Sequence, residues 1–250
     1  MTGSSSAPAA LDGRVALVTG ASGGIGAALC RSVSAAGATV AVGYGRGRDA
    51  AESLVRELAN GGRRAAAFGA DMGDPEAPAR LVAEVEGELG SIDVLIANHG
   101  HARRATYDEV DADAFDLTLA VNLRAPFLLA QQVLGGMRER GFGRILFVSS
   151  LAAFRGGMVG PDYAASKAGL HGLTFFLASR VAHDGVTVNA IAPGFVETAM
   201  LPEEAAELAT TVPIGRVGRP EEVSELALAM VTNAYLTGHV VPLDGGSHPR

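Results

Sequence analysis

The chain has 250 residues, of which 48% are hydrophobic and 19% charged, and its formal net charge is −7. This length and apolar content are sufficient for a large core, and α/β proteins of this size often form one domain. The negative charge argues against a nucleic-acid partner, which would require a basic face to neutralise phosphates. The single cysteine, Cys30, excludes an internal disulfide, and no Cys/His spacing indicates a zinc site.

Residues 1–10 carry neither the basic start nor the apolar stretch of a signal peptide. We therefore expect residues 1–12 to form a flexible tail and residues 13–250 to form a single domain. No apolar run approaches the roughly 20 residues that cross a bilayer. These features predict a soluble, cytoplasmic protein that contacts no membrane.

Short β-branched runs alternate along the chain with longer helical patterns. Continuously apolar runs such as Val15–Val18 are typical of strands covered on both faces. The alternation predicts one doubly wound, Rossmann-type α/β domain with a seven-stranded parallel sheet flanked by helices. In chain order, the expected strands are Arg14–Thr19, Thr39–Val42, Arg64–Phe68, Asp93–Ala97, Arg144–Ser149, Thr187–Ile191 and Val240–Leu243. The expected helices are Gly24–Ala36, Asp49–Asn60, Pro75–Leu89, Ala112–Arg140, Tyr163–His183 and Pro220–Thr232.

A glycine-rich segment, residues 19–26, joins the first expected strand to the first expected helix. Gly20 can make the sharp exit from the strand, Gly24 can let the backbone approach a pyrophosphate, and Gly26 can let the helix pack closely on the sheet. The amino end of the helix then offers free N–H groups to phosphates. An ordinary strand–helix turn is the alternative, but the placement favours a dinucleotide site.

The end of the second expected strand indicates which nicotinamide cofactor binds. NAD enzymes of this topology place an acid there to hold the ribose 2′-hydroxyl. Here residues 42–48 contain no carboxylate, and they contain Arg46 and Arg48, either of which can pair with a 2′-phosphate. Arg46 is the first candidate and Arg48 the second, the alternative being that both lie in solvent. The pattern favours NADP(H).

Tyr163 and Lys167 open a long helical pattern, and their spacing of four places them on one helix face. A free tyrosine, with a pKa of about 10, is a poor base at neutral pH. A nearby ammonium would lower that pKa and make the pair a tuned acid–base centre. Taken by itself, such a pair can also be two surface neighbours.

Together these motifs resemble the short-chain dehydrogenase/reductase family over residues 14–246. Within the family the chain is most similar to bacterial 3-oxoacyl-(acyl-carrier-protein) reductases, through Tyr44–Arg46, Pro193–Met200 and Leu236–Gly246. Ser150 precedes Tyr163 by thirteen residues, the family's separation. The matching segments are Thr19–Gly26, Asp71, Asn98–Gly100, Asn122, Ser149–Ser150, Tyr163–Lys167, Pro193–Gly194 and Asp244–Gly246.

The resemblance implies a role for each catalytic position. Tyr163 would donate the proton to a carbonyl, or accept it from an alcohol, and Ser150 would hydrogen-bond the same oxygen. Lys167 would lower the pKa of Tyr163 and hold the nicotinamide ribose, while Asn122 would support a water that relays protons. No metal is expected, because a side-chain hydroxyl supplies the electrophile.

The resemblance also implies a set of residues around the cofactor. Asp71 and Met72 would meet the adenine, Asn98 and Gly100 would lie beside the adenosine ribose, and Val196 and Thr198 would hold the carboxamide. The full expected cofactor set is Gly20, Ser22, Gly24, Ile25, Gly26, Tyr44, Arg46, Asp71, Met72, Asn98, Gly100, Tyr163, Lys167, Pro193, Val196 and Thr198.

Three features depart from the family pattern. His99 stands where the family usually has alanine, and Gly23 stands where many NADP-using members have arginine. The segment Glu197–Arg219 fits neither strand nor helix periodicity and follows the carboxyl end of a strand. We expect it to be a mobile lid. It is also shorter than the corresponding segment of fatty-acid-type reductases.

The leading hypothesis is an NADPH-dependent reductase of a β-keto group on a carrier-bound or related chain. An alcohol, sugar or steroid dehydrogenase and a nucleotide-binding protein without turnover are the alternatives. Family members commonly form tetramers through the two long helices and the last strand, so a homotetramer is expected. The candidate pocket residues are mostly apolar: His101, Leu151, Phe154, Met158, Phe195 and Met200.

Overall fold

The fold is organised around one seven-stranded parallel sheet with the strand order β3-β2-β1-β4-β5-β6-β7. The computed structural model describes residues 9–198, 201 and 205–248. The strands are β1 (Val15–Thr19), β2 (Thr39–Tyr44), β3 (Ala65–Gly69), β4 (Val94–Ala97), β5 (Gly143–Val148), β6 (Val186–Pro193) and β7 (Val240–Leu243). The Rossmann-type sheet predicted from the sequence is confirmed.

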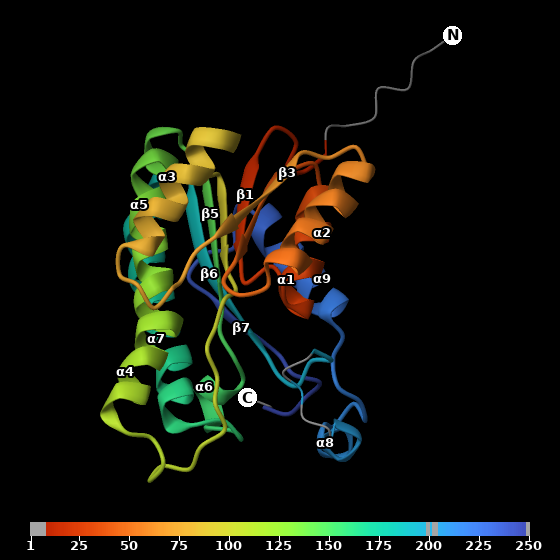
Figure 1. The fold of residues 1–250 in the computed structure, drawn as a ribbon, viewed down its shortest axis with the longest axis vertical. Coiled ribbons are helices and arrows are strands. Elements are labelled where there is room, and N and C mark those ends of the chain that lie inside the picture. The colour runs from red at the N-terminus through yellow and green to blue at the C-terminus, as the bar shows by residue number, and fades with distance from the viewer. Residues whose placement is uncertain (1–8, 199–200, 202–204, 249–250) are drawn as a thin grey trace.

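Helices cover both faces of the sheet (Figure 1). One layer contains α1 (Gly24–Ala35), α2 (Arg48–Asn60) and α9 (Pro220–Thr232), with α1 packed against α9. The other contains α3 (Ala77–Leu89), α5 (Ala125–Glu139) and α7 (Pro161–Val181). The strand order reverses between β1 and β4, and sheets of this kind bind ligands in the crevice at that point.

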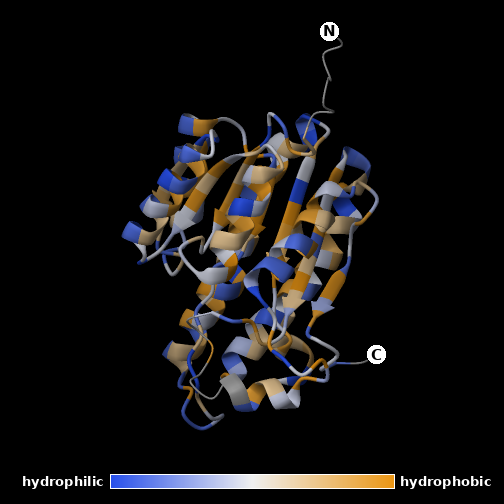
Figure 2. Ribbon diagram, turned by 90° about the vertical axis from the view of Figure 1, so that its right-hand side faces the viewer, coloured by the Kyte–Doolittle hydropathy of each residue, from blue (hydrophilic) through white to orange (hydrophobic). Residues whose placement is uncertain are grey.

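Strand periodicity divides the core into two layers. Leu17 and Leu95 face the layer that contains α3 and α5, whereas their neighbours Val18 and Ile96 face the layer of α1 and α9. Successive side chains of a strand point to opposite faces, so a strand buried on both sides must be apolar throughout. Figure 2 shows this as hydrophobic strands between helices whose outer faces are hydrophilic.

The long helix expected at Ala112–Arg140 is interrupted. It consists of α4 (Ala112–Leu119), a π-helical turn η1 (Ala120–Arg124) and α5. Pro126 lacks an N–H and therefore cannot continue a regular α-helical ladder through this region. Helical periodicity persists on both sides of the π turn, which is why the sequence pattern alone did not reveal it.

This interrupted helix is also the one helical segment, among the described residues, that is long and apolar enough to span a membrane, at Ala112–Glu139. In the fold, α5 packs on α3, β4 and β5. Leu129 and Val133 are buried in that contact. We therefore attribute its apolar character to core packing.

Two short helices beyond the carboxyl edge of the sheet were not expected: α6 (Ala152–Arg155) after β5, and α8 (Ala205–Thr211) inside the segment expected to be a lid. At the opposite, amino edge, the 3₁₀ turn η2 (Ala182–Asp184) follows α7 and leads into β6. Val196 pairs with Gly218, so that segment is closed at its base. Figure 1 shows α6 and α8 beyond the same end of the sheet.

The packed chain includes part of the segment expected to be a tail. Leu11 is buried, and its N–H donates to the Ala36 carbonyl at 2.8 Å. This hydrogen bond connects the turn that precedes β1 to the end of α1. Packing against α1 therefore begins before residue 13, within the segment expected to be a tail.

Candidate active site

The glycine-rich turn between β1 and α1 is shaped as a phosphate cradle. Gly20 has a φ of +64°, and a Cβ there would lie 2.7 Å from His99 Cα. A Cβ at Gly26 would overlap the Gly20 carbonyl oxygen. Helix α1 begins after Gly23 with no side-chain cap and no acidic residue in its first turn. Its N–H groups are therefore available to an anion.

Asn98 braces this turn from the end of β4. Its Nδ2 donates to the carbonyls of Thr19 and Gly20, each at 3.1 Å. The side-chain amide of Asn98 therefore holds the backbone of the cradle at Thr19 and Gly20. Thr198 reaches the same region, since a Cβ at Gly24 would lie 3.2 Å from Thr198 Cγ2.

The loop after β2 lies against the cradle. A Cβ at Gly47 would lie 2.7 Å from Ser22 Cβ, so the two turns are in contact. Arg46 is exposed beside them, whereas the Nε of Arg48 donates to Glu52 Oε1 at 2.8 Å. Tyr44 packs its ring over Gly69 at the end of β3. These residues form the edge where a 2′-phosphate would lie.

The remaining expected cofactor positions lie around the same strand ends. The Asp71 carboxylate accepts the Gly73 N–H at 2.9 Å, and Met72 is buried beneath the turn that follows β3. Pro193 ends β6, and its carbonyl accepts the Leu151 N–H at 2.8 Å. A cradle with crowded glycines and an uncapped helix terminus fits a dinucleotide.

Four catalytic candidates come from three elements. Tyr163 and Lys167 lie on α7, Ser150 follows β5, and Asn122 lies in the π turn η1. The Ser150 side chain lies close enough to Tyr163 to lower the pKa of its hydroxyl. Lys167 Nζ lies 5.9 Å from the centre of the Tyr163 ring and donates to the Val148 carbonyl at 2.8 Å. The spacing of four thus holds both side chains on one face.

Asn122 is fixed by three hydrogen bonds. Its Oδ1 accepts the His101 N–H at 2.7 Å, and its Nδ2 donates to the His101 carbonyl at 2.8 Å and to Ser166 Oγ at 3.1 Å. Gly100 connects it to the lysine, because a Cβ there would lie 3.5 Å from both Asn122 Oδ1 and Lys167 Nζ. The structure therefore brings all four expected catalytic residues to one site.

Burial determines the protonation of this group. Burial raises the pKa of Tyr163 above its usual value, and the hydrogen bond from Ser150 only partly opposes that rise. Burial lowers the pKa of Lys167 to about 8. The net shift of the Tyr163 pKa is therefore upward and not downward as expected, because desolvation of the phenol outweighs the influences that lower it.

His99 has a structural role that sequence reasoning did not assign. Its Nδ1 lies 2.6 Å from Thr19 Oγ1, and its Nε2 lies 3.0 Å from the Val121 carbonyl. A carbonyl only accepts, so Nε2 carries the proton and Nδ1 accepts from the threonine hydroxyl. Burial and then the Lys167 ammonium hold the pKa of His99 at about 3, against the Val121 carbonyl, which raises it. The ring is therefore neutral.

The expected pocket residues lie around α6 and the ends of β5 and β6. Leu151 is buried, Met158 is exposed, and Phe195 lines a small cavity with Val212 and Ile214. Met200 lies outside the described residues. The Phe154 ring lies between His171 and His248, at centroid distances of 4.8 and 5.0 Å.

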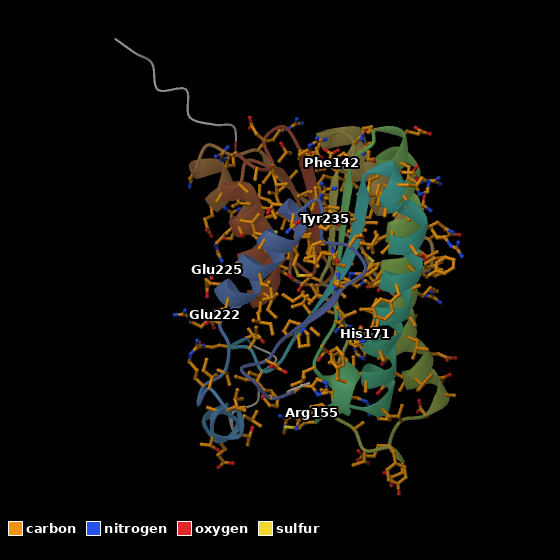
Figure 3. The ribbon with its side chains drawn as sticks, turned by 180° about the vertical axis from the view of Figure 1, so that it is seen from behind. Phe142, Arg155, His171, Glu222, Glu225 and Tyr235 are labelled. Atoms are coloured by element: carbon orange, nitrogen blue, oxygen red, sulfur yellow. The ribbon has the colours of Figure 1, made fainter. Side chains whose placement is uncertain are left out.

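One further contact in this region had no sequence signal. His171 Nε2 lies 2.9 Å from Ser149 Oγ, which also donates to the Lys167 carbonyl at 3.0 Å. His171 lies on α7, and Arg155 ends α6 at the same end of the molecule (Figure 3). His171 comes four residues after Lys167, but only the fold brings it to Ser149.

A phosphate cradle beside a Ser–Tyr–Lys group, at the carboxyl edge of a doubly wound sheet, defines a Rossmann-type oxidoreductase. Residues 14–209 match the family model described as short chain dehydrogenase. The chain belongs to this family.

Relatives and solved structures agree with this assignment. The chain is 37% identical to an acetoacetyl-CoA reductase of Allochromatium vinosum over 240 residues, which cover 93% of this chain and 98% of the relative. It is also 37% identical to a 3-oxoacyl-(acyl-carrier-protein) reductase of Thermotoga maritima over 242 residues, covering 94% and 98%. A blue fluorescent protein from a metagenomic library, solved with NADPH, superposes with a TM-score of 0.89 at 35% identity, covering 96% and 99%.

The buried His99 predicts a specific loss of stability in acid. Its pKa is about 3 in the folded chain against 6.5 for an unperturbed histidine, so between these values the folded chain binds fewer protons than the unfolded chain. Stability is therefore lost as pH falls below 6.5. From about pH 8 to about pH 5 we expect the free energy of unfolding to decrease by roughly 2 kcal/mol through this residue.

Chemical denaturation of the wild type and of His99→Gln at both pH values measures this contribution. The glutamine variant has no titratable ring, so its free energy of unfolding should decrease by roughly 2 kcal/mol less than that of the wild type. Equal decreases in the two proteins would contradict the prediction.

Proposed function

We propose that this protein is an NADPH-dependent reductase of β-keto thioesters, with the acyl chain carried by coenzyme A or by an acyl carrier protein. The observation that supports this most directly is the Ser150–Tyr163 hydroxyl pair beside Lys167, all at the cradle-bearing edge of the sheet. The relatives named acetoacetyl-CoA reductase and 3-oxoacyl-(acyl-carrier-protein) reductase favour a β-keto thioester as substrate.

The protonation states suit reduction of a ketone. A tyrosine with a raised pKa is protonated at neutral pH and can donate its proton to a carbonyl oxygen. Ser150, whose side chain lies beside that hydroxyl, would hold the same carbonyl oxygen. Bound NADPH supplies the hydride. As the phenol loses its proton, the Lys167 ammonium and the Ser150 hydroxyl stabilise the negative charge that develops on Tyr163.

The 2′-phosphate of the cofactor would be held by Arg46. The guanidinium of Arg48 is paired with Glu52, whereas Arg46 makes no hydrogen bond or ion pair with the residues that the structure describes. Ser22 lies across from Gly47 and can supply a hydroxyl to the same phosphate. Gly23 stands where many family members carry an arginine, and Arg46 would supply the positive charge that this arginine provides in them.

Arg46→Ala should raise the KM for NADPH by roughly 10- to 100-fold with little change in kcat, because one charge-assisted pair to the phosphate is lost. The KM for NADH should not increase, since NADH has no 2′-phosphate. Arg48→Ala is the matched control and should change the KM for NADPH by less than about threefold. If Arg48→Ala raises the KM for NADPH as much as Arg46→Ala does, the 2′-phosphate is not held by Arg46 alone, which would contradict the proposal.

Tyr163→Phe should lower kcat for reduction of acetoacetyl-CoA by roughly 100- to 10,000-fold, because the proton donor is removed. Binding of NADPH, followed by fluorescence titration, should remain. The reaction is followed as the loss of NADPH absorbance. Wild-type protein that binds NADPH yet reduces no ketone would indicate a nucleotide-binding protein without turnover. Oxidation of a polyol, sugar or steroid alcohol in place of ketone reduction would indicate the dehydrogenase alternative.

We further propose that the protein acts as a homotetramer in the cytoplasm. Large apolar side chains are exposed along α4, α5 and α7, including Leu117, Phe127 and Phe176. Phe127 also lines a hollow in this region, together with Asp116 and Arg124. Across a two-fold axis, the acid of one copy can face the base of the other, which supports pairing of this face with itself.

Leu173→Asp, which introduces a charge into this hollow, should convert the tetramer to dimers in sedimentation velocity. The matched control is Arg56→Glu on α2, an exposed position on the opposite helix layer, which should leave the tetramer intact. A monomeric wild-type protein would refute the proposed assembly.

A further inference from the structure

The π turn η1 leaves the Val121 backbone carbonyl without a helical donor. In a regular α-helix the Val121 carbonyl would accept the N–H of Ala125, but that N–H donates to the Ala120 carbonyl instead. The next residue along the chain is Pro126, which has no N–H to offer. A buried carbonyl without a partner destabilises the fold, so the turn requires a donor from elsewhere.

His99 supplies that donor from the end of β4. Its Nε2–H bonds the Val121 carbonyl at 3.0 Å, and its Nδ1 accepts from Thr19 Oγ1 at 2.6 Å. Thr19 Oγ1 in turn accepts the N–H groups of Asn98 at 3.2 Å and of His99 at 3.4 Å. His99 is 8% exposed, and both of its ring nitrogens have partners. It therefore connects the end of β1, beside the cradle, to the π turn.

The π turn determines where Asn122 lies. Asn122 directly follows Val121, and its side chain bonds the backbone of His101, two residues after His99. A two-point attachment results, because His99 holds the turn through its side chain while His101 holds Asn122 through its backbone. Gly100, between them, faces both Asn122 Oδ1 and Lys167 Nζ.

We propose that His99 is a positioning residue for the proton-transfer group: through Val121 it holds the π turn that places Asn122 beside Lys167. An alanine at this position, as the family usually has, could not make either ring contact. The role rests on the proposed reductase function, since it acts on catalysis only through Asn122 and Lys167. The other ring nitrogen contacts Thr19 at the start of the cradle, so one ring connects the cradle to the π turn.

Two substitutions separate these contacts. In His99→Gln the side-chain amide nitrogen can take the place of Nε2 and still reach the Val121 carbonyl. In His99→Asn the shorter amide can take the place of Nδ1 and reach Thr19, but it cannot reach Val121. The Val121 contact is therefore retained in one variant and lost in the other, with a polar group kept in the same space.

With acetoacetyl-CoA and NADPH, His99→Asn should lower kcat by roughly 10- to 100-fold while the KM for NADPH changes by less than about threefold, because misplacement of a catalytic group lowers the rate of the chemical step. His99→Gln should keep kcat within about threefold of the wild type. Equal losses of kcat in the two variants, or no loss in His99→Asn, would overturn the positioning role. Circular dichroism and thermal unfolding establish that both variants are folded.

A measurement on wild-type protein tests the contact without substrate. In a sample with ¹⁵N-labelled histidine, one imidazole, absent from the His99→Gln spectrum, should show the Nε2–H tautomer and no titration between about pH 5 and pH 8. A protonated ring, or the Nδ1–H tautomer, would overturn the proposal even if His99→Asn does not fold. Because this result needs no turnover, failure of the wild type to reduce a ketone would refute the proposed function alone.

Discussion

Parallel strands all end at the same edge of a sheet, and the site depends on that alignment. Thr19 pairs in register with Ala97, Ala97 with Phe147, and Phe147 with Ala190. The residues that follow these strands are therefore brought level with one another, although they are about 170 residues apart along the chain. The cradle follows β1, the Asn98–Gly100 turn follows β4, and Ser150 follows β5. Helix α7 then adds Tyr163 and Lys167 from one face of the sheet.

The same alignment places many polar groups where water is scarce, and several of them are paired with other protein groups. Lys167 has the Val148 carbonyl, Ser149 has His171, and Asn122 has the backbone of His101. Burial still changes their protonation, lowering the pKa of Lys167 to about 8 and raising that of Tyr163. A phenol that keeps its proton next to a poorly solvated ammonium is poised to donate, which agrees with reduction of a carbonyl.

Much of the fold could be predicted because its signals are local. The strand at Val15–Thr19 lies within the apolar run that predicted it, since a strand covered on both faces must be apolar throughout. Helix α7 begins two residues before the expected start, at Pro161, a residue favoured in the first helical turn. The break at η1 was missed although Pro126 lies beside it, because apolar periodicity continues across the break. The pairing of Val196 with Gly218 joins distant residues and has no local signal.

The sequence by itself determined the class of fold and indicated the cradle and the candidate catalytic residues, because each is encoded in residue types at short, regular spacings. The tertiary structure decided how those residues behave. The lowered pKa of Lys167 and the raised pKa of Tyr163 are consequences of burial, which no spacing of residues reports. The partners of His99, Thr19 and the Val121 carbonyl, lie 80 and 22 residues away along the chain. Only the folded chain brings them together, because hydrogen bonds depend on distances in space and not on separation in sequence.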